Sequence, residues 1–141
     1  MQYISNSELD TVKIAEDFAR RTTRGDILAL SGDLGSGKTF FARSFINYFF
    51  RCQGKTEVNV ISPTFNLVKM YDSADFTIYH LDLYRLKRVE ELYELDIDGI
   101  FQNVSLIEWP ALIYRIAPKD RLKSIEIRIL GNSREFTVKN S

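Results

Sequence analysis

The sequence has little of several residue types, and each shortage excludes a class of protein. It contains one cysteine and one histidine, so it can form neither an internal disulfide nor a zinc cluster of cysteines and histidines. Its 19 basic residues are balanced by 19 acidic ones, which argues against a protein whose main function is to bind nucleic-acid phosphates. No hydrophobic run approaches the ~20 residues of a membrane span, and the N-terminus lacks a signal-peptide pattern. We therefore expect a cytoplasmic protein without membrane contacts.

Length and composition favour one folded domain. A chain of 141 residues is short for two separate cores. Hydrophobic residues at 45% and charged residues at 27% are typical of a globular protein rather than a disordered one. The sequence has no repeat, low-complexity stretch or linker, so we expect a single domain over residues 1–141.

The order of the expected elements indicates an α/β fold. Ser5 and Glu8 match a capping box for a first helix that ends between residues 22 and 25, and further helices are expected at 38–51 and 89–95. The expected strands share short apolar or alternating patterns, and they lie at residues 27–30, 66–71, 76–81, 104–108, 122–130 and 135–138. This order predicts a mixed sheet with a parallel core and antiparallel hairpins, with helices on both faces.

Residues 32–39 match the phosphate-binding pattern G-x-x-x-x-G-K-[ST] in full. Gly35 and Gly37 let successive backbone N–H groups point inward, towards phosphate oxygens. The helix that follows adds its positive N-terminal end. We expect Lys38 to reach the β- and γ-phosphates and the Thr39 hydroxyl to ligate Mg²⁺. The strand before the motif and the helix after it favour this function over a chance glycine turn.

Two carboxylates follow expected strands and are candidates for work on the metal and the attacking water. Glu108 ends a strongly apolar strand, whereas Asp82 follows a more mixed one. Either side chain could order a magnesium-bound water, orient the water that attacks the γ-phosphate, or simply cap the next turn. The sequence leaves this choice open.

Three more residues near these motifs have two interpretations each. Thr64 belongs either to a switch that senses the γ-phosphate or to a serine–proline turn. His80 is either a hydrogen-bonded structural residue of its strand or a catalyst, and the structural interpretation is favoured. Trp109 either covers the site or closes the core, and the core is favoured.

Two classes of phosphate-loop protein are disfavoured. The sequence lacks the Asn-Lys-x-Asp motif with which GTPases read guanine, and Asp96-Ile97-Asp98-Gly99 is interpreted as a turn because it follows a helical stretch. A small-molecule kinase usually needs an arginine-rich lid, and the arginines here are scattered. Such a kinase and a nucleotide-dependent scaffold remain the alternatives to an ATPase.

Four motifs, in this order and spacing, resemble the TsaE (YjeE) family of bacterial P-loop ATPases. They are Gly-Asp-Leu-Gly-Ser-Gly-Lys-Thr, Ser-Pro-Thr-Phe-Asn-Leu-Val, Tyr-His-Leu-Asp-Leu-Tyr-Arg-Leu and Leu-Ile-Glu-Trp-Pro, and the resemblance spans about residues 4–138. It implies a protein that binds and slowly hydrolyses ATP and is required for threonylcarbamoyladenosine modification of tRNA. It also implies action on a complex of TsaD and TsaB, with tRNA handled only through these partners.

The resemblance assigns site residues position by position. It implies catalytic roles for Lys38, Glu108 and Asp82, magnesium positions at Thr39 and Glu108, and ATP with Mg²⁺ as the cofactors. The residues that it places around the nucleotide are Gly35, Ser36, Gly37, Lys38 and Thr39 at the phosphates, Thr64 and Trp109 beside them, and Glu8 and Arg134 near the adenine. Arg134 offers a plane that can stack on the base. Because no arginine finger is evident, we expect slow hydrolysis by the isolated protein.

Overall fold

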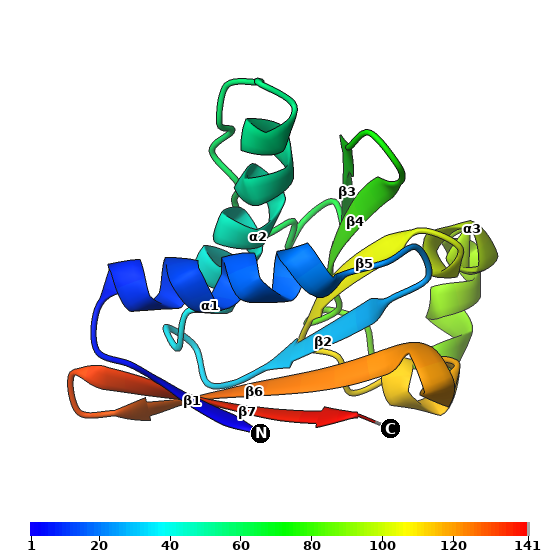
Figure 1. Ribbon diagram of the computed structural model, residues 1–141. Helices are drawn as coiled ribbons and strands as arrows, with labels where there is room; N and C mark the ends of the chain where they lie inside the picture. Colours follow the sequence, from blue (N-terminus) through cyan, green and yellow to red (C-terminus); the bar gives the residue numbers. More distant parts are fainter. Residues whose placement is uncertain (141) are drawn as a thin grey trace.

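The computed structural model describes residues 1–140, which form one seven-stranded sheet with helices packed against it (Figure 1). The strands are β1 (Gln2–Ser5), β2 (Ile27–Ser31), β3 (Val68–Asp72), β4 (Thr77–Asp82), β5 (Val104–Glu108), β6 (Leu122–Leu130) and β7 (Ser133–Asn140). The α-helices are α1 (Glu8–Arg21), α2 (Lys38–Cys52) and α3 (Ile97–Phe101). Three short 3-10 helices are η1 (Val89–Glu94), η2 (Ile113–Arg115) and η3 (Lys119–Arg121).

The strands lie in the order β1-β7-β6-β2-β5-β4-β3. The four central strands β6, β2, β5 and β4 run parallel to one another, and β7, β1 and β3 add antiparallel pairs at the two sides. The predicted mixed sheet with a parallel core is confirmed. Its parallel arrangement brings the carboxyl ends of β2, β4 and β5 to the same edge, which is where ligands bind in open α/β sheets.

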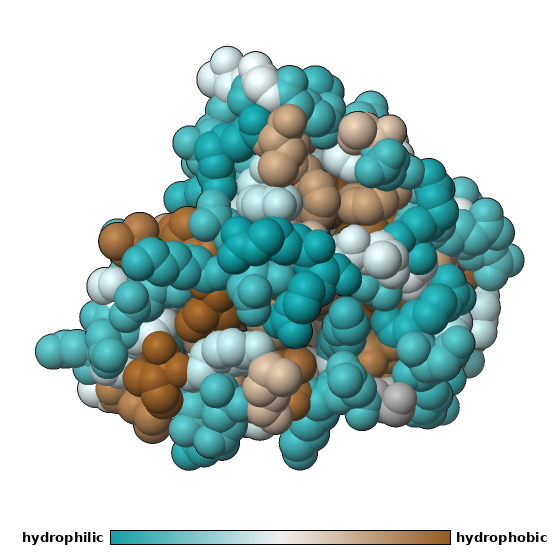
Figure 2. Space-filling view, in the orientation of Figure 1, coloured by the Kyte–Doolittle hydropathy of each residue, from teal (hydrophilic) through white to brown (hydrophobic). Residues whose placement is uncertain are grey.

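Both faces of the sheet are covered, as predicted. Alternate residues of β2 point to opposite faces: Leu28 and Leu30 pack with α1 and α2, whereas Ile27 and Ala29 pack with α3 and the 3-10 helices. Each fully buried leucine or isoleucine stabilises the fold by roughly 1.5–3 kcal/mol. Figure 2 shows the outer surface of one side as mainly hydrophilic, with hydrophobic side chains in small separate patches.

The start of the first helix differs from the sequence prediction. The predicted capping box at Ser5 is wrong, because Ser5 is the last residue of β1, where it pairs with Arg134 of β7. The helix cap is Ser7, whose hydroxyl accepts a hydrogen bond from the backbone N–H of Asp10 (3.1 Å). The carboxylate of Asp10 in turn accepts from the N–H of Asn6 (2.9 Å).

The Asp-x-x-Gly motif opens a short helix rather than forming an isolated turn. Asp96 is the N-cap of α3, and its carboxylate accepts a hydrogen bond from the N–H of Gly99 (3.3 Å). A Cβ atom on Gly99 would lie 2.3 Å from that carboxylate, so the close approach requires glycine. The motif therefore has a structural role in helix capping.

Helix α2 carries the phosphate-loop motif at its start and is held firmly by the core. Its side chains Phe41, Phe45 and Ile46 are fully buried, and the rings of Phe18 and Phe41 meet edge to face with centroids 5.8 Å apart. A helix that is apolar on several sides is expected to be covered on several sides. None of the helices described over residues 1–140 has the length and apolar character that a membrane crossing requires.

The segment between α2 and β3 lacks regular secondary structure, yet it is anchored to α2. The buried amide of Asn47 donates to the carbonyl of Val58 (2.9 Å) and accepts from the N–H of the same residue (2.8 Å). The guanidinium of Arg43 donates two hydrogen bonds to the carbonyl of Val60 (3.0 and 3.2 Å). These side chains fix the path of the segment that leads to Ser62 and Thr64.

Candidate nucleotide-binding site

The loop between β2 and α2 wraps around a cavity at the carboxyl edge of the sheet. Gly37 is the N-cap of α2 and has a φ of 111°, a conformation in which a side chain would be strained. No atom lies within 4 Å of the place where its Cβ would stand. The glycine is therefore required by the path of the backbone, which turns the first N–H groups of α2 towards the cavity.

Lys38 lies at the base of this cavity and is almost entirely buried. Its ammonium donates to the carbonyls of Gly32 (2.7 Å) and Asp33 (3.1 Å) and lies 4.1 Å from the ring centroid of Trp109. Burial lowers the pKa of Lys38, and the negative charges of Glu108, Asp82 and Asp33 partly offset that effect. The structure thus keeps a buried cation among acidic groups, where a bound anion would stabilise its charge.

Glu108 ends β5 and is held by two neighbours. The hydroxyl of Thr39 lies 3.0 and 3.1 Å from its two carboxylate oxygens. The Nε2 atom of His80, on the adjacent strand β4, lies 2.6 Å from Oε2. A carboxylate can only accept, so both neighbours act as donors. Only 2% of Glu108 is exposed, and its position is fixed relative to both the sheet and α2.

Asp82 pairs in register with Glu108 at the end of β4, but its neighbours are different. Its Oδ2 accepts from the hydroxyls of Ser62 (2.5 Å) and Thr64 (3.0 Å), both in the irregular segment. Its Oδ1 accepts from the backbone N–H of Tyr84 (2.9 Å). Asp82 therefore ties the Ser-Pro-Thr-Phe segment to the edge of the sheet.

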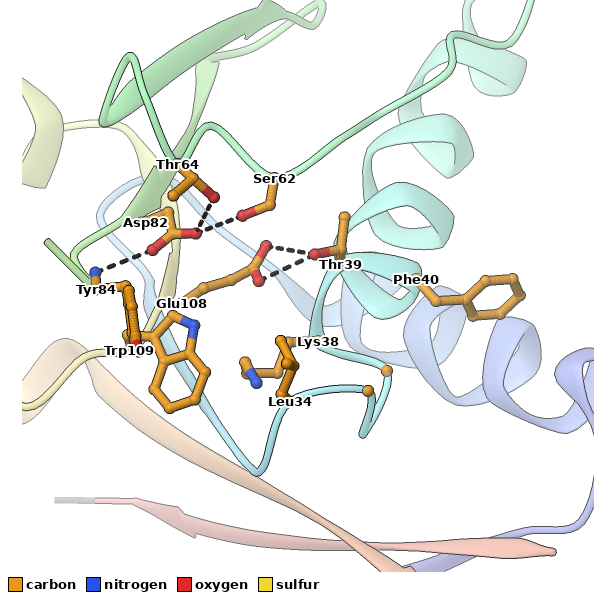
Figure 3. A pocket seen from close by; sticks show the side chains of 12 residues that line it. Leu34, Lys38, Thr39, Phe40, Ser62, Thr64, Asp82, Tyr84, Glu108 and Trp109 are labelled. Atoms are coloured by element: carbon orange, nitrogen blue, oxygen red, sulfur yellow. Dashed lines mark hydrogen bonds between the residues drawn. The ribbon is translucent and has the colours of Figure 1, made fainter.

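The cavity has a volume of about 490 Å³ and brings together most of the predicted residues (Figure 3). In this view, Asp82 and Glu108 lie on one side of the start of α2, and Phe40 points away from them. The lining residues are Leu34, Gly35, Gly37, Lys38, Thr39, Phe40, Ser62, Thr64, Asp82, Tyr84, Glu108 and Trp109. We call this cavity the phosphate pocket.

A second cavity of about 230 Å³ adjoins the first one. The two share Gly37 and Phe40, so they lie on either side of the junction between the loop and α2. The lining residues are Ser5, Ser7, Glu8, Thr11, Ser36, Gly37, Phe40, Asn132 and Arg134. The guanidinium of Arg134 donates to the carbonyl of Ser36 (3.1 Å). Glu8 and Arg134, which are 126 positions apart in the sequence, thus lie beside the loop in one cavity, which we call the side pocket.

Sequence reasoning assigned no role to two polar residues of this site, Tyr84 and Ser62. Tyr84 lines the phosphate pocket, and its ring lies against Trp109 with centroids 5.0 Å apart. Ser62 shares Asp82 with Thr64 and lies in the same motif. His80 is a buried residue of β4 with a side-chain hydrogen bond, as predicted, and its partner is Glu108.

The comparisons with known proteins agree with this geometry. A family model described as "Threonylcarbamoyl adenosine biosynthesis protein TsaE" matches residues 5–136. The chain belongs to the TsaE family. A TsaE relative from Rickettsia bellii, named "tRNA threonylcarbamoyladenosine biosynthesis protein TsaE", is 43% identical over 96% of this chain and 91% of its own length.

A relative with the same printed name from Bacillus subtilis is 38% identical over 91% of this chain and 78% of its own length. Among solved structures, Bacillus subtilis YdiB matches with a TM-score of 0.78 and 31% sequence identity. That match covers 100% of this chain and 86% of YdiB. The TsaE fold therefore extends over the whole described chain, including the loop and both pockets.

The donor set of the phosphate pocket suits a magnesium ion that is shared with a phosphate ligand. Thr39 and Glu108 offer hydroxyl and carboxylate oxygens, the type of ligand that Mg²⁺ prefers. Among residues 1–140, no group of three or more His, Cys, Asp or Glu side chains is placed to hold a metal ion by itself. Magnesium usually takes one or two protein ligands and completes its shell with phosphate and water oxygens.

Proposed function

We propose that this protein binds MgATP in the phosphate pocket and side pocket and hydrolyses it slowly, in the service of tRNA threonylcarbamoyladenosine biosynthesis. The observation that carries the proposal is the complete phosphate-binding motif between β2 and α2, with a buried lysine and two buried carboxylates in the same cavity. The names of the TsaE relatives support the place in tRNA modification.

The two pockets suggest how the nucleotide lies. The triphosphate would follow the backbone N–H groups of the loop in the phosphate pocket, and the base would enter the side pocket across Gly37. There the Glu8 carboxylate can accept a hydrogen bond from the exocyclic amine of adenine, and the Arg134 guanidinium can stack on the ring. Such an arrangement favours adenine over guanine, whose corresponding group is an acceptor.

Each charged residue of the phosphate pocket then has a distinct task. Lys38 exchanges its contacts with the carbonyls of Gly32 and Asp33 for contacts with phosphate oxygens and stabilises the charge that develops during transfer. Thr39 and Glu108 would hold the magnesium ion, which supplies neutralising charge at the phosphates when bound. Glu108, assisted by Asp82, orients the attacking water and accepts its proton.

The isolated protein should turn over slowly because its site has few positive charges. Lys38 is the only cation among the described residues that line the phosphate pocket. The guanidinium of Arg85, close in sequence to Asp82, lies over the ring of Phe65 at 5.4 Å from its centroid. Fast phosphoryl transfer in P-loop proteins commonly needs an added arginine. A complex of TsaD and TsaB is the proposed partner that completes the site.

The rim of the phosphate pocket supports such a partner. Leu34 and Tyr84 line the pocket and remain 88% and 65% exposed, and Phe65, beside Thr64, is 85% exposed. Large exposed hydrophobic side chains around a polar cavity are typical of protein interaction sites. The tRNA would then be handled by the partners, which agrees with the zero net charge.

The test is ATP hydrolysis by the protein alone and with purified TsaD and TsaB. We expect slow hydrolysis alone, stimulation of at least about tenfold by the partners, and loss of both in Lys38→Ala. Lys13→Ala, which changes an exposed lysine of α1, is the matched control and should behave as the unchanged protein. Partner binding without stimulated turnover would favour the scaffold, and transfer of phosphate to a small molecule would favour the kinase.

A further inference from the structure

His80 is a fully buried residue of β4, and the one hydrogen bond described for its side chain reaches the site. Its Nε2 lies 2.6 Å from Glu108 Oε2, and both side chains are sealed from solvent. The pairing of β4 with β5 sets His80 beside Leu106 and Asp82 beside Glu108. His80 and Glu108 therefore share the face of the sheet that α2 covers.

Stability of the core does not explain a histidine at this position. Among residues 1–140, no hydrogen-bond partner lies within reach of its buried Nδ1 atom. A buried polar atom without a partner destabilises the folded state. The neighbouring residues on this face, Ile78 and Leu106, are apolar and belong to the core around α2. An apolar side chain would suit that core better, so the hydrogen bond to Glu108 is the property that distinguishes His80.

The consequence of this hydrogen bond is the direction of the Glu108 carboxylate. His80 donates from the sheet side and Thr39 donates from the start of α2. Two donors on different elements restrict the orientation of the carboxylate, whose two oxygens lie 3.0 and 3.1 Å from the Thr39 hydroxyl. Hydrogen bonds from a surrounding shell commonly fix metal-ligating side chains in this way.

We propose that His80 is a positioning residue that aims Glu108 at Thr39, so that the two present a preformed pair of oxygen ligands to the magnesium ion of a bound nucleotide. This inference rests on the proposed function. It assigns His80 a role in metal-dependent binding, and not in contact with the nucleotide itself.

The experiment uses nucleotide binding rather than turnover. Trp109, the only tryptophan in the sequence, lies in the phosphate pocket, so its fluorescence can report the dissociation constant for ATP with Mg²⁺ and with EDTA. The ratio of these two constants measures the benefit from magnesium. We compare His80→Gln, whose longer amide can donate near the Nε2 position, with His80→Asn, whose shorter amide falls short of Glu108.

We expect His80→Gln to keep most of the magnesium benefit and His80→Asn to lose about tenfold of it. The dissociation constant in EDTA should change by no more than about twofold in both. An equal magnesium benefit in both variants and the unchanged protein would overturn the inference. If the unchanged protein itself gains nothing from magnesium, the metal part of the proposed function fails instead.

A measurement on the unchanged protein covers the case in which the variants do not fold. His80 is the only histidine in the sequence, so its ring gives a single set of signals in a ¹H–¹⁵N spectrum. We expect the Nε2–H signal to shift when ADP with Mg²⁺ is added and to stay unmoved with ADP and EDTA. The same spectrum under both conditions would contradict a link between His80 and the metal ligands.

Discussion

Glu108 and Asp82 stand opposite each other on neighbouring strands, yet their surroundings differ. Both are nearly inaccessible to solvent, and both end a strand at the same edge of the sheet. Glu108 is held by His80 of β4 and Thr39 of α2, two regular elements. Asp82 is held by the hydroxyls of Ser62 and Thr64, which belong to a segment without regular structure.

The difference shows that two similar carboxylates in one pocket can be held by different kinds of structure: Glu108 by regular elements and Asp82 largely by an irregular segment. The partners of Glu108 lie in the sheet and in a helix whose phenylalanines pack in the core, so we expect its position to change little when a ligand binds. Two of the three partners of Asp82, the hydroxyls of Ser62 and Thr64, lie in the irregular segment, and we expect that segment to exchange these contacts for contacts with a nucleotide. We therefore expect Glu108 to govern the chemistry and Asp82 to govern the conformation of that segment.

The strongest test of this comparison is Glu108→Gln. We expect turnover with the partners to fall about 10²–10³-fold because the amide cannot take up the proton of the attacking water. ATP binding in EDTA, read from Trp109 fluorescence, should change by less than about threefold, whereas the gain in affinity from Mg²⁺ should fall by at least about tenfold because Glu108 is a proposed magnesium ligand. Single-turnover hydrolysis measures the loss directly. Unchanged turnover would move the role of orienting water to Asp82.

The matched change, Asp82→Asn, should cost less in turnover, about tenfold, because charged hydrogen bonds to Ser62 and Thr64 are replaced by neutral ones. Its distinguishing effect should be faster hydrogen exchange at the backbone amides of residues 61–67 other than Pro63. Glu108→Gln should leave exchange in that segment unaltered. If both variants loosen the segment equally, the two carboxylates do not have separate roles.

Most of the fold could be predicted because its elements carry local patterns. The strands β2, β5 and β6 are short apolar or alternating runs, and α2 follows directly from the phosphate-loop motif. Strand β1 could not be predicted from Gln2–Ser5 alone, because those residues become a strand only through pairing with β7. The cap of α1 was misplaced for the same reason, since that pairing draws Ser5 into the sheet.

The site was predictable where residues share a motif and not where the contacts are long-range. Lys38 and Thr39 follow from the loop, and Glu108 follows from its place after an apolar strand. The contact of His80 with Glu108 depends on β4 and β5 being parallel neighbours, which no local pattern reveals. The course of residues 53–67 depends on Arg43 and Asn47, which act through side-chain contacts with its backbone.

Asn47→Ala tests whether the hydrogen bonds between Asn47 and Val58 anchor the irregular segment that leads to Ser62 and Thr64. The change removes the two hydrogen bonds to Val58 and should lower the free energy of unfolding by about 1 kcal/mol, measured by urea denaturation. Hydrogen exchange at residues 58–62 should rise, and turnover should fall only severalfold. Asn59→Ala, at an exposed position of the same segment, is the control and should change neither quantity.

The smallest expected effect is on the stability of the nucleotide-free protein, and it comes from Lys38, which lies near the negative charges of Glu108 and Asp82. Because burial lowers its pKa from the ordinary value of 10.5, the protonated lysine disfavours the folded state when no nucleotide is bound. Lys38→Met should therefore give a nucleotide-free protein slightly more stable than the unchanged one at pH 8. The same change should abolish ATP binding, because it removes the lysine that contacts the phosphates.

The pH dependence of stability tests whether the buried charge of Lys38 destabilises the folded state. Between the lowered pKa of the folded state and 10.5, the unfolded chain holds the proton more tightly, so the stability of the unchanged protein rises with pH in that window. The difference in the free energy of unfolding between Lys38→Met and the unchanged protein, measured by urea denaturation, should consequently decrease between pH 8 and pH 10. Lys13→Met, at an exposed position, should show no such trend. A variant less stable than the unchanged protein at pH 8 would contradict this prediction. It would mean that the contacts of Lys38 with Gly32, Asp33 and Trp109 stabilise the folded state by more than the burial of its charge destabilises it.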